Sequence, residues 1–223
     1  MRHTAEPLQQ VDRVFVRWHG RRLLYFAGCD YHRLASHPRV LAAARRGLKQ
    51  FGLNVAASRK TTGNHSLYEE LERALARFFQ AERAVLVSNG YLTNLAVAQA
   101  LCGEFTHALV DVRSHASLAD AAFALEATVV PFAHRQPADL KKQLGKLGNR
   151  TRPIVCTDGM FSHDGSAAPL AEYLAALPAN ALLLVDDSHG AGVLGPAGRG
   201  TPSHCHVRDA RVIQTITLSK ALG

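Results

Sequence analysis

Residues 181–190 read Ala181-Leu182-Leu183-Leu184-Val185-Asp186-Asp187-Ser188-His189-Gly190, and this stretch decides the fold. Its first half is apolar at every position, and acidic, hydroxyl and imidazole side chains follow at once. A short run without polar alternation predicts a strand that is covered on both faces, which is typical of parallel sheets. Ligands of open parallel sheets bind at the carboxyl ends of the strands, so the polar residues after the run are candidates for a site.

Similar short apolar runs recur along the chain, and segments with helical periodicity lie between them. The other runs are Ala84–Val87, Ala108–Val110, Thr128–Val130, Ile154–Cys156 and Val212–Ile216. The helical patterns are Ser66–Phe79, Leu92–Leu101, Ser117–Leu125, Ala138–Leu147 and Leu170–Leu177. This alternation predicts an α/β fold, a three-layer α/β/α domain with a mostly parallel sheet.

The first 65 residues have a looser pattern. A hairpin turn is predicted at Gly20–Arg22, and a helix opened by Ser36 and Pro38 is predicted over Pro38–Phe51. We therefore expect an N-terminal arm with one helix over residues 1–65 and the main domain over residues 66–223.

The first predicted helix of the main domain, Ser66–Phe79, is amphipathic. Ser66 is a candidate N-cap, and Glu69 with Arg73 forms a possible i,i+4 ion pair. The apolar stripe consists of Leu67, Leu71, Leu75 and Phe78.

Composition sets the class of protein but not its chemistry. The 223 residues are 47% hydrophobic and 20% charged, as in ordinary globular proteins. The formal net charge is +8, yet the basic residues are scattered, so a solvated surface or anionic ligands are favoured over nucleic acid. The four cysteines have neither metal nor disulfide spacing, and no stretch resembles a signal peptide or a membrane span. We expect a cytoplasmic protein that binds neither membrane nor nucleic acid.

Polar residues follow five of the apolar runs, at Ser88–Tyr91, Asp111–His115, Thr157–Gly165, Asp186–Gly190 and Thr217–Lys220. A single Asp or His at such a place is commonly a cap or a turn residue. An Asp after one buried strand and a Lys after the next instead suggest a cofactor site, because a buried lysine must be paired or neutralised. Pyridoxal 5'-phosphate (PLP) needs these groups: a lysine, a carboxylate for the pyridine nitrogen, a flat side chain over the ring and a phosphate cup.

Two other motifs predict less. Gly190–Gly195 matches G-x-G-x-x-G, but Pro and Gly residues follow it, so we expect no helix there and no dinucleotide-binding turn. His204-Cys205-His206 cannot form a closed metal site without further ligands, so no metal is expected.

Four motifs in order resemble the α-oxoamine synthases, which are fold-type I PLP enzymes. They are Thr62–Glu72, Ser88–Tyr91 with Asn94, Asp186–Gly190 with Gly192 and Gly195, and Thr217–Lys220. The resemblance implies the large domain of a PLP-dependent transferase, with a C-terminal small domain that this chain lacks. It further implies a homodimer whose chains meet near Thr62–His65.

The resemblance also assigns roles to residues. It implies that Lys220 holds PLP as a Schiff base and later moves a proton, and that Asp186 partners the pyridine nitrogen. His189 resembles the donor to the phenolic oxygen of PLP, and His115 the histidine stacked on the ring face. The remaining implied cofactor-binding residues are Gly90, Tyr91 and Thr217 at the phosphate and Ser162 near the cofactor.

The implied reaction is a decarboxylative condensation of an amino acid with an acyl thioester, carried by CoA or acyl carrier protein, to an α-amino ketone. Cys29, Asp158 and the segment Gly52–Arg59 depart from the family pattern at positions near the substrate. Two alternatives stay open. One is another fold-type I reaction, such as aminotransfer, and the other is an inactive truncated remnant or dimerisation module.

Overall fold

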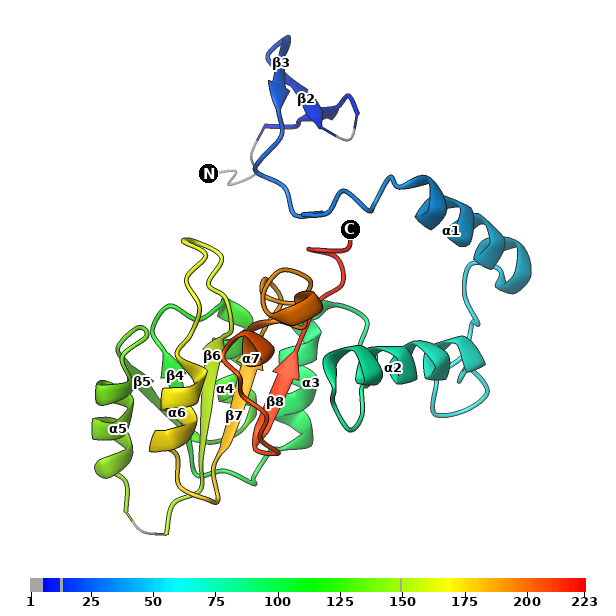
Figure 1. The fold of residues 1–223 in the computed structure, drawn as a ribbon. Coiled ribbons are helices and arrows are strands. Elements are labelled where there is room, and N and C mark those ends of the chain that lie inside the picture. Colours follow the sequence, from blue (N-terminus) through cyan, green and yellow to red (C-terminus); the bar gives the residue numbers. More distant parts are fainter. Residues whose placement is uncertain (1–5, 13, 149) are drawn as a thin grey trace. The chain divides into compact units, whose positions relative to one another are not determined.

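The computed structural model describes residues 6–12, 14–148 and 150–223 (Figure 1). They form two compact units, one of residues 57–218 and one of residues 1–56 together with 219–223. The structure thus divides the chain near Ala56, whereas the sequence pattern suggested residue 65.

The larger unit is built on a five-stranded sheet in which every neighbouring pair is parallel. The strands are β4 (His107–Asp111), β5 (Thr128–Phe132), β6 (Pro153–Asp158), β7 (Leu182–Asp186) and β8 (Val212–Thr215), in the spatial order β5-β4-β6-β7-β8. The predicted parallel sheet is confirmed. The strand order reverses between β4 and β6, and such a switch point is where open sheets bind ligands.

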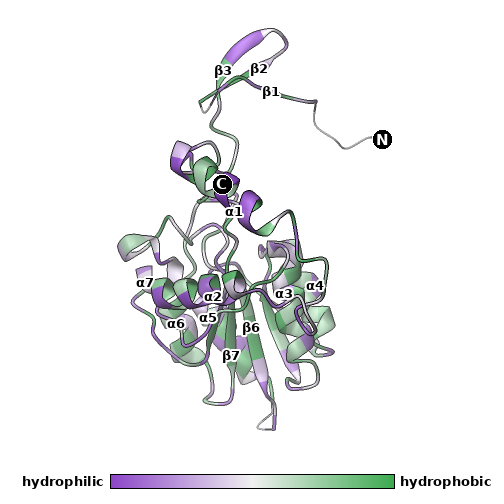
Figure 2. Ribbon diagram, turned by 90° about the vertical axis from the view of Figure 1, so that its right-hand side faces the viewer, coloured by the Kyte–Doolittle hydropathy of each residue, from purple (hydrophilic) through white to green (hydrophobic). Residues whose placement is uncertain are grey.

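Helices cover both faces of this sheet, as predicted for three layers (Figure 1). On one face lie α3 (Gly90–Ala100) and α4 (Ala116–Ala124), and on the other lie α5 (Pro137–Gly145) and α6 (Leu170–Ala176). Alternate residues of one strand enter the two cores: Ile154 packs toward α3 and α4, and Val155 toward α5 and α6. Figure 2 shows the resulting apolar centre around β6 and β7.

The predicted strand at Ala84–Val87 was wrong. The segment forms no ladder, Val85 is 78% exposed, and the Leu86 backbone N–H donates to Glu72 Oε1 at 2.9 Å instead of to a neighbouring strand. An apolar run becomes a strand only when another strand supplies its hydrogen bonds. Among the described residues, no strand lies beside this segment.

The helix α2 (Ser66–Phe79) has the predicted bounds, and the Glu69–Arg73 pair is present at 3.9 Å. Its N-cap is His65 rather than Ser66, because His65 Nδ1 accepts from the Leu67 N–H at 3.1 Å. After β7, a three-residue 3-10 turn (Pro196–Gly198) precedes the short α7 (Thr201–His204). No long helix follows Gly195, in agreement with the prediction.

The smaller unit contains a three-stranded antiparallel sheet of β1 (Gln9–Gln10), β2 (Phe15–Trp18) and β3 (Arg21–Leu24). The predicted hairpin is present, but its turn residues are His19 and Gly20, both with positive φ. The helix α1 (Pro38–Phe51) also has the predicted bounds, and its N-cap is His37 rather than Ser36. Within the described residues, no helix is long and apolar enough to cross a membrane.

Candidate cofactor site

A row of polar residues ends three adjacent strands of the larger unit. In the parallel register Asp158 pairs with Asp186, and Asp186 pairs with Thr215. Partners in a parallel ladder point to the same side of the sheet, so these side chains form one row at the carboxyl edge. All three side chains are buried, so their polar atoms need hydrogen-bond partners within the folded protein.

Asp186 is held at both oxygens. Its Oδ2 accepts from Asn94 Nδ2 at 2.6 Å, and its Oδ1 accepts from the Ser188 backbone N–H at 3.0 Å. Both oxygens of the carboxyl group therefore accept from donors that the fold holds in place. A buried carboxyl group of fixed orientation is thus available at the end of β7.

Asn94 connects this carboxylate to the neighbouring elements. Its Oδ1 accepts from Thr215 Oγ1 at 2.7 Å, and its Nδ2 donates to Ser117 Oγ at 2.9 Å as well as to Asp186. Asn94 was predicted only as part of a motif, and Ser117 and Thr215 were not predicted. The available signal was that Asn94 shares a helical face with the apolar residues Val97, Ala98 and Leu101.

His115 begins α4 as its N-cap, and four contacts fix it. Its backbone N–H donates to Asp158 Oδ1 at 3.0 Å, and its Nδ1 accepts from the Ser117 N–H at 3.2 Å. The same Nδ1 lies 2.8 Å from Ser117 Oγ. The Tyr91 ring meets the His115 ring edge-on, with 6.1 Å between centroids. Asp158 thus accepts a hydrogen bond from the backbone of His115. The resemblance implied that Asp158 lies near the substrate.

The amino end of α3 lies against the segment that follows β8. Gly90 is the first residue of α3, and its N-cap Asn89 accepts from the Leu92 N–H at 3.0 Å. A Cβ on Gly90 would lie 3.1 Å from the Thr217 Cβ, so Thr217 sits directly beside this helix end. The first N–H groups of a helix have no intrahelical acceptors and attract anions.

Tyr91 is anchored at the same helix end. Its hydroxyl donates to the Asp120 carboxylate, which raises the pKa of Tyr91. The structure therefore brings together Gly90, Tyr91, His115, Asp186 and Thr217 of the predicted residues, through contacts made within the larger unit.

Asp187, which sequence analysis gave no role, anchors the loop after β7. It accepts from the Thr201 N–H at 2.8 Å, from Thr201 Oγ1 at 2.6 Å and from Gln214 Nε2 at 2.7 Å. A Cβ on Gly159, Gly190 or Gly200 would clash with its carboxylate. The glycines of this region thus serve close packing around a buried acid.

The remaining predicted residues are His189, Ser162 and Lys220. His189 is half-buried in the loop after β7, and Ser162 is exposed in the loop after β6. Lys220 belongs to the smaller unit, where the Tyr31 N–H donates to its carbonyl at 3.2 Å and the His32 N–H donates to the Ala221 carbonyl at 3.3 Å. The roles of these three residues stay predictions.

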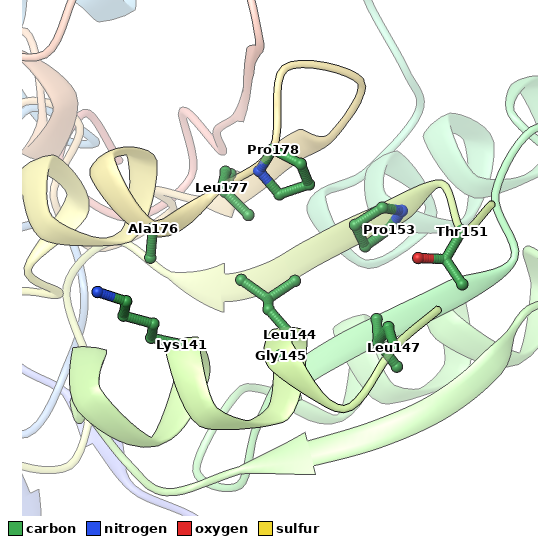
Figure 3. Close-up of a pocket in the computed structure, with 9 residues that line it drawn as sticks. All are labelled: Lys141, Leu144, Gly145, Leu147, Thr151, Pro153, Ala176, Leu177 and Pro178. Atoms are coloured by element: carbon green, nitrogen blue, oxygen red, sulfur yellow. The ribbon is translucent and has the colours of Figure 1, made fainter. Parts of the chain in front are cut away.

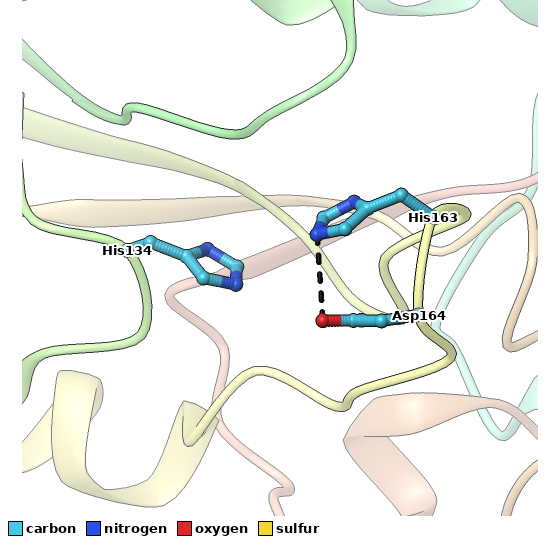
Figure 4. A group of neighbouring side chains, drawn as sticks. All are labelled: His134, His163 and Asp164. Carbon is cyan, nitrogen blue, oxygen red and sulfur yellow. Dashed lines mark ion pairs between the residues drawn. The ribbon is translucent and has the colours of Figure 1, made fainter.

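A second polar group consists of His134, His163 and Asp164 (Figure 4). His134 Nδ1 lies 3.0 Å from Asp111 Oδ1, and His163 Nε2 lies 3.4 Å from Asp164 Oδ2. Arg113 Nη1 is 3.1 Å from the same His163 nitrogen. A guanidinium at this position opposes the binding of a metal cation, so we assign no metal to this group.

A hollow of about 370 Å³ lies between the ends of α5 and α6 (Figure 3). Thr151 and Pro153 of its lining stand at the start of β6, and Leu177 and Pro178 follow α6. It therefore lies at the amino edge of the sheet, opposite the row of Asp158, Asp186 and Thr215. Most of its lining is apolar, and it holds none of the predicted site residues.

Comparison with known proteins identifies the family. The model of aminotransferase class I and II matches residues 23–223. The chain belongs to this family. The predicted class of protein and its fold are thereby confirmed.

Individual relatives agree with the resemblance to α-oxoamine synthases. An 8-amino-7-oxononanoate synthase from Thioalkalivibrio sulfidiphilus is 43% identical over 97% of this chain and 54% of its own length. A serine palmitoyltransferase structure from Sphingomonas wittichii has a TM-score of 0.89 and 32% identity, covering 96% of this chain and 54% of that one. A variant of the S. paucimobilis serine palmitoyltransferase, whose structure contains a PLP–myriocin aldimine, has a TM-score of 0.88 and 30% identity over the same shares. The chain spans about half the length of the relatives it matches.

Proposed function

We propose that the chain carries the PLP-binding part of an acyltransferase that condenses an amino acid with an acyl thioester and releases CO2, as an 8-amino-7-oxononanoate synthase of biotin synthesis does. The observation that carries this proposal is the buried Asp186, whose oxygens accept from Asn94 and from the Ser188 N–H. A fixed carboxylate of this kind suits a protonated pyridine nitrogen.

The surrounding residues fit the rest of PLP. His115, at the start of α4, offers a flat imidazole for the ring face. A Cβ on Gly90 would lie 3.1 Å from the Thr217 Cβ, so a larger side chain would crowd Thr217. Glycine therefore leaves the helix N–H groups open to a phosphate, with the Thr217 side chain beside them. His189 follows β7 closely and is proposed to donate to the phenolic oxygen, and Ser162 to lie near the cofactor.

The proposed chemistry divides between cofactor and protein. When bound, PLP supplies an electron sink for the α-carbon of the amino acid. Asp186 would hold the proton on the pyridine nitrogen, and the Lys220 amine would take the α-proton of the amino acid. His115 orients the reacting groups over the ring.

The test of the cofactor site is spectroscopic. The protein is mixed with PLP, and the visible absorbance of lysine-bound PLP is measured for the wild type and for Lys220→Ala. We expect the band in the wild type and its loss in the variant, with Lys146→Ala as a control that keeps it. A band that survives Lys220→Ala would contradict the role of Lys220.

Turnover separates the proposed reaction from aminotransfer. A condensing enzyme releases free thiol from an acyl-CoA or acyl carrier protein when an amino acid is present, whereas an aminotransferase converts keto acids without a thioester. PLP binding without either activity would instead support an inactive remnant.

We also propose a homodimer. The predicted apolar stripe of α2 is present, and three of its residues, Leu67, Leu71 and Phe78, are each more than a third exposed. Three large apolar side chains on one helix favour burial against a second chain.

A further inference from the structure

Asn94 joins two groups that the proposed function assigns to different parts of the cofactor. Its Nδ2 carries two protons, and both are used, one toward Asp186 Oδ2 and one toward Ser117 Oγ. Its Oδ1 accepts from Thr215 Oγ1. The side chain is completely buried, so this bonding pattern has no competition from water.

The orientation of the amide follows from its neighbours. An ionised carboxylate only accepts hydrogen bonds, so the nitrogen of Asn94, not its oxygen, must face Asp186. Thr215 then donates to the oxygen, and its own position is fixed at the end of β8. The amide thus has one allowed direction.

The orientation of the Asn94 amide also determines how His115 is hydrogen-bonded. Because Ser117 Oγ accepts from Asn94 Nδ2 at 2.9 Å, its hydroxyl proton is free to point to His115 Nδ1 at 2.8 Å. The Ser117 backbone N–H also donates to Nδ1, at 3.2 Å. Two donors on one ring nitrogen require a lone pair there, so the neutral ring carries its proton on Nε2.

We propose that Asn94 is a positioning residue that locks the Asp186 carboxylate and, through Ser117, fixes His115 as the Nε2–H tautomer. This proposal rests on the proposed function in assigning Asp186 to the pyridine nitrogen and His115 to the ring face. A single side-chain amide would then orient both the nitrogen partner and the ring-face donor of one cofactor. Its consequence is that His115 presents an N–H, rather than a lone pair, from Nε2.

The first experiment needs no cofactor. Histidine side chains are labelled with ¹⁵N, and the His115 signal is assigned with a His115→Asn variant. We expect an unprotonated Nδ1 and a protonated Nε2 in the wild type. Asn94→Asp keeps the shape of the side chain but removes both N–H donors, and Ser117→Ala removes only the link to His115. Both variants should raise the fraction of the Nδ1–H tautomer, and an unchanged tautomer in both would overturn this part of the proposal.

The second experiment uses PLP labelled at the ring nitrogen. Asn94→Asp should weaken PLP binding by about tenfold or more, since it replaces a charge-assisted bond to Asp186 with a second carboxylate. It should also move the ¹⁵N signal of the ring nitrogen toward the unprotonated form. Ser117→Ala, which leaves the Asn94–Asp186 bond intact, should leave that signal in place.

Asn180→Asp is the matched control. Asn180 donates to the Thr151 carbonyl at 3.0 Å just before β7, at the opposite edge of the sheet. It should change PLP affinity by less than about twofold. Equal affinity in Asn94→Asp and the wild type would overturn the role of Asn94 at Asp186. If the wild type binds no PLP, the proposed function fails, while the His115 tautomer still tests the Asn94–Ser117 connection.

Discussion

Asp186 and Asp187 are adjacent, both are buried, and their partners give them different roles. Asp186 accepts from Asn94 and the Ser188 N–H at the edge where the cofactor is proposed to bind. Asp187 points to the other side and accepts from Thr201 at the start of α7 and from Gln214 of β8. The sequence Asp-Asp therefore combines one residue of the proposed cofactor site with one residue that anchors the loop after β7.

Asp187 predicts a dependence of stability on pH. Burial raises the pKa of Asp187 to about 6 from its ordinary 3.8. Between these values the folded protein binds the proton more tightly than the unfolded chain, so the free energy of unfolding falls as pH rises from about 4 to about 6. The full effect is roughly 3 kcal/mol at 1.36 kcal/mol per pKa unit.

Urea unfolding of the wild type and of Asp187→Asn over pH 4 to 7 measures this contribution. The difference between the two proteins isolates Asp187 from the other carboxyl groups. We expect the wild type to lose stability relative to the variant across that window. Parallel pH profiles for the two proteins would contradict the raised pKa.

At the scale of elements, the loop after β7 requires Gly190 because of close packing and not because of a positive φ. A Cβ on Gly190 would clash with the carboxylate of Asp187 and lie close to Thr201 Oγ1. Gly190→Ala should therefore destabilise the protein by about 2–4 kcal/mol, because neither the buried acid nor α7 can retreat without losing a hydrogen bond.

Gly47→Ala is the control for this change. Gly47 lies in α1, and a Cβ there would meet nothing within 4 Å. The substitution should stabilise the helix by about 0.5–1 kcal/mol, since Ala loses less backbone entropy on folding. Thermal unfolding of both variants tests the pair, and a Gly190→Ala protein as stable as the wild type would refute the packing argument.

Most of the helices and strands were predicted from local sequence patterns, because such patterns depend only on residues that are close together in the sequence. The helices α1 and α2 have the predicted bounds, and the parallel strands were found to within a few residues. The N-caps were missed, since His37 and His65 replace the expected Ser36 and Ser66 with an imidazole nitrogen that accepts the same kind of backbone N–H.

The site was predictable only in part for a different reason. Asp186 follows an apolar run directly and His115 lies in the polar segment after another, so position in the sequence indicated them. The Asn94, Ser117 and Thr215 contacts join α3, α4 and β8, and a hydrogen bond between distant residues leaves no local pattern. The failed strand at Ala84–Val87 has the same cause, because strand pairing also depends on a distant partner.

At the scale of the whole molecule, the exposed stripe of α2 predicts the oligomeric state. Light scattering after size exclusion should give the mass of a dimer for the wild type. Leu71→Asp should shift it toward the monomer, because a charge at a buried apolar contact costs several kcal/mol. Glu70→Lys, on the polar side of α2, should leave the dimer intact. A monomeric wild type would contradict the proposed homodimer.

The unpaired segment Ala84–Val87 has a consequence for handling the protein. Its apolar side chains, and backbone groups that pair with no other strand, resemble the open edge of a sheet, which recruits strands from other molecules. We expect the protein to aggregate on warming, with a turbidity that increases with protein concentration. Val85→Lys should lower this turbidity. The aggregates should carry the β-rich signature of intermolecular sheets in infrared spectra.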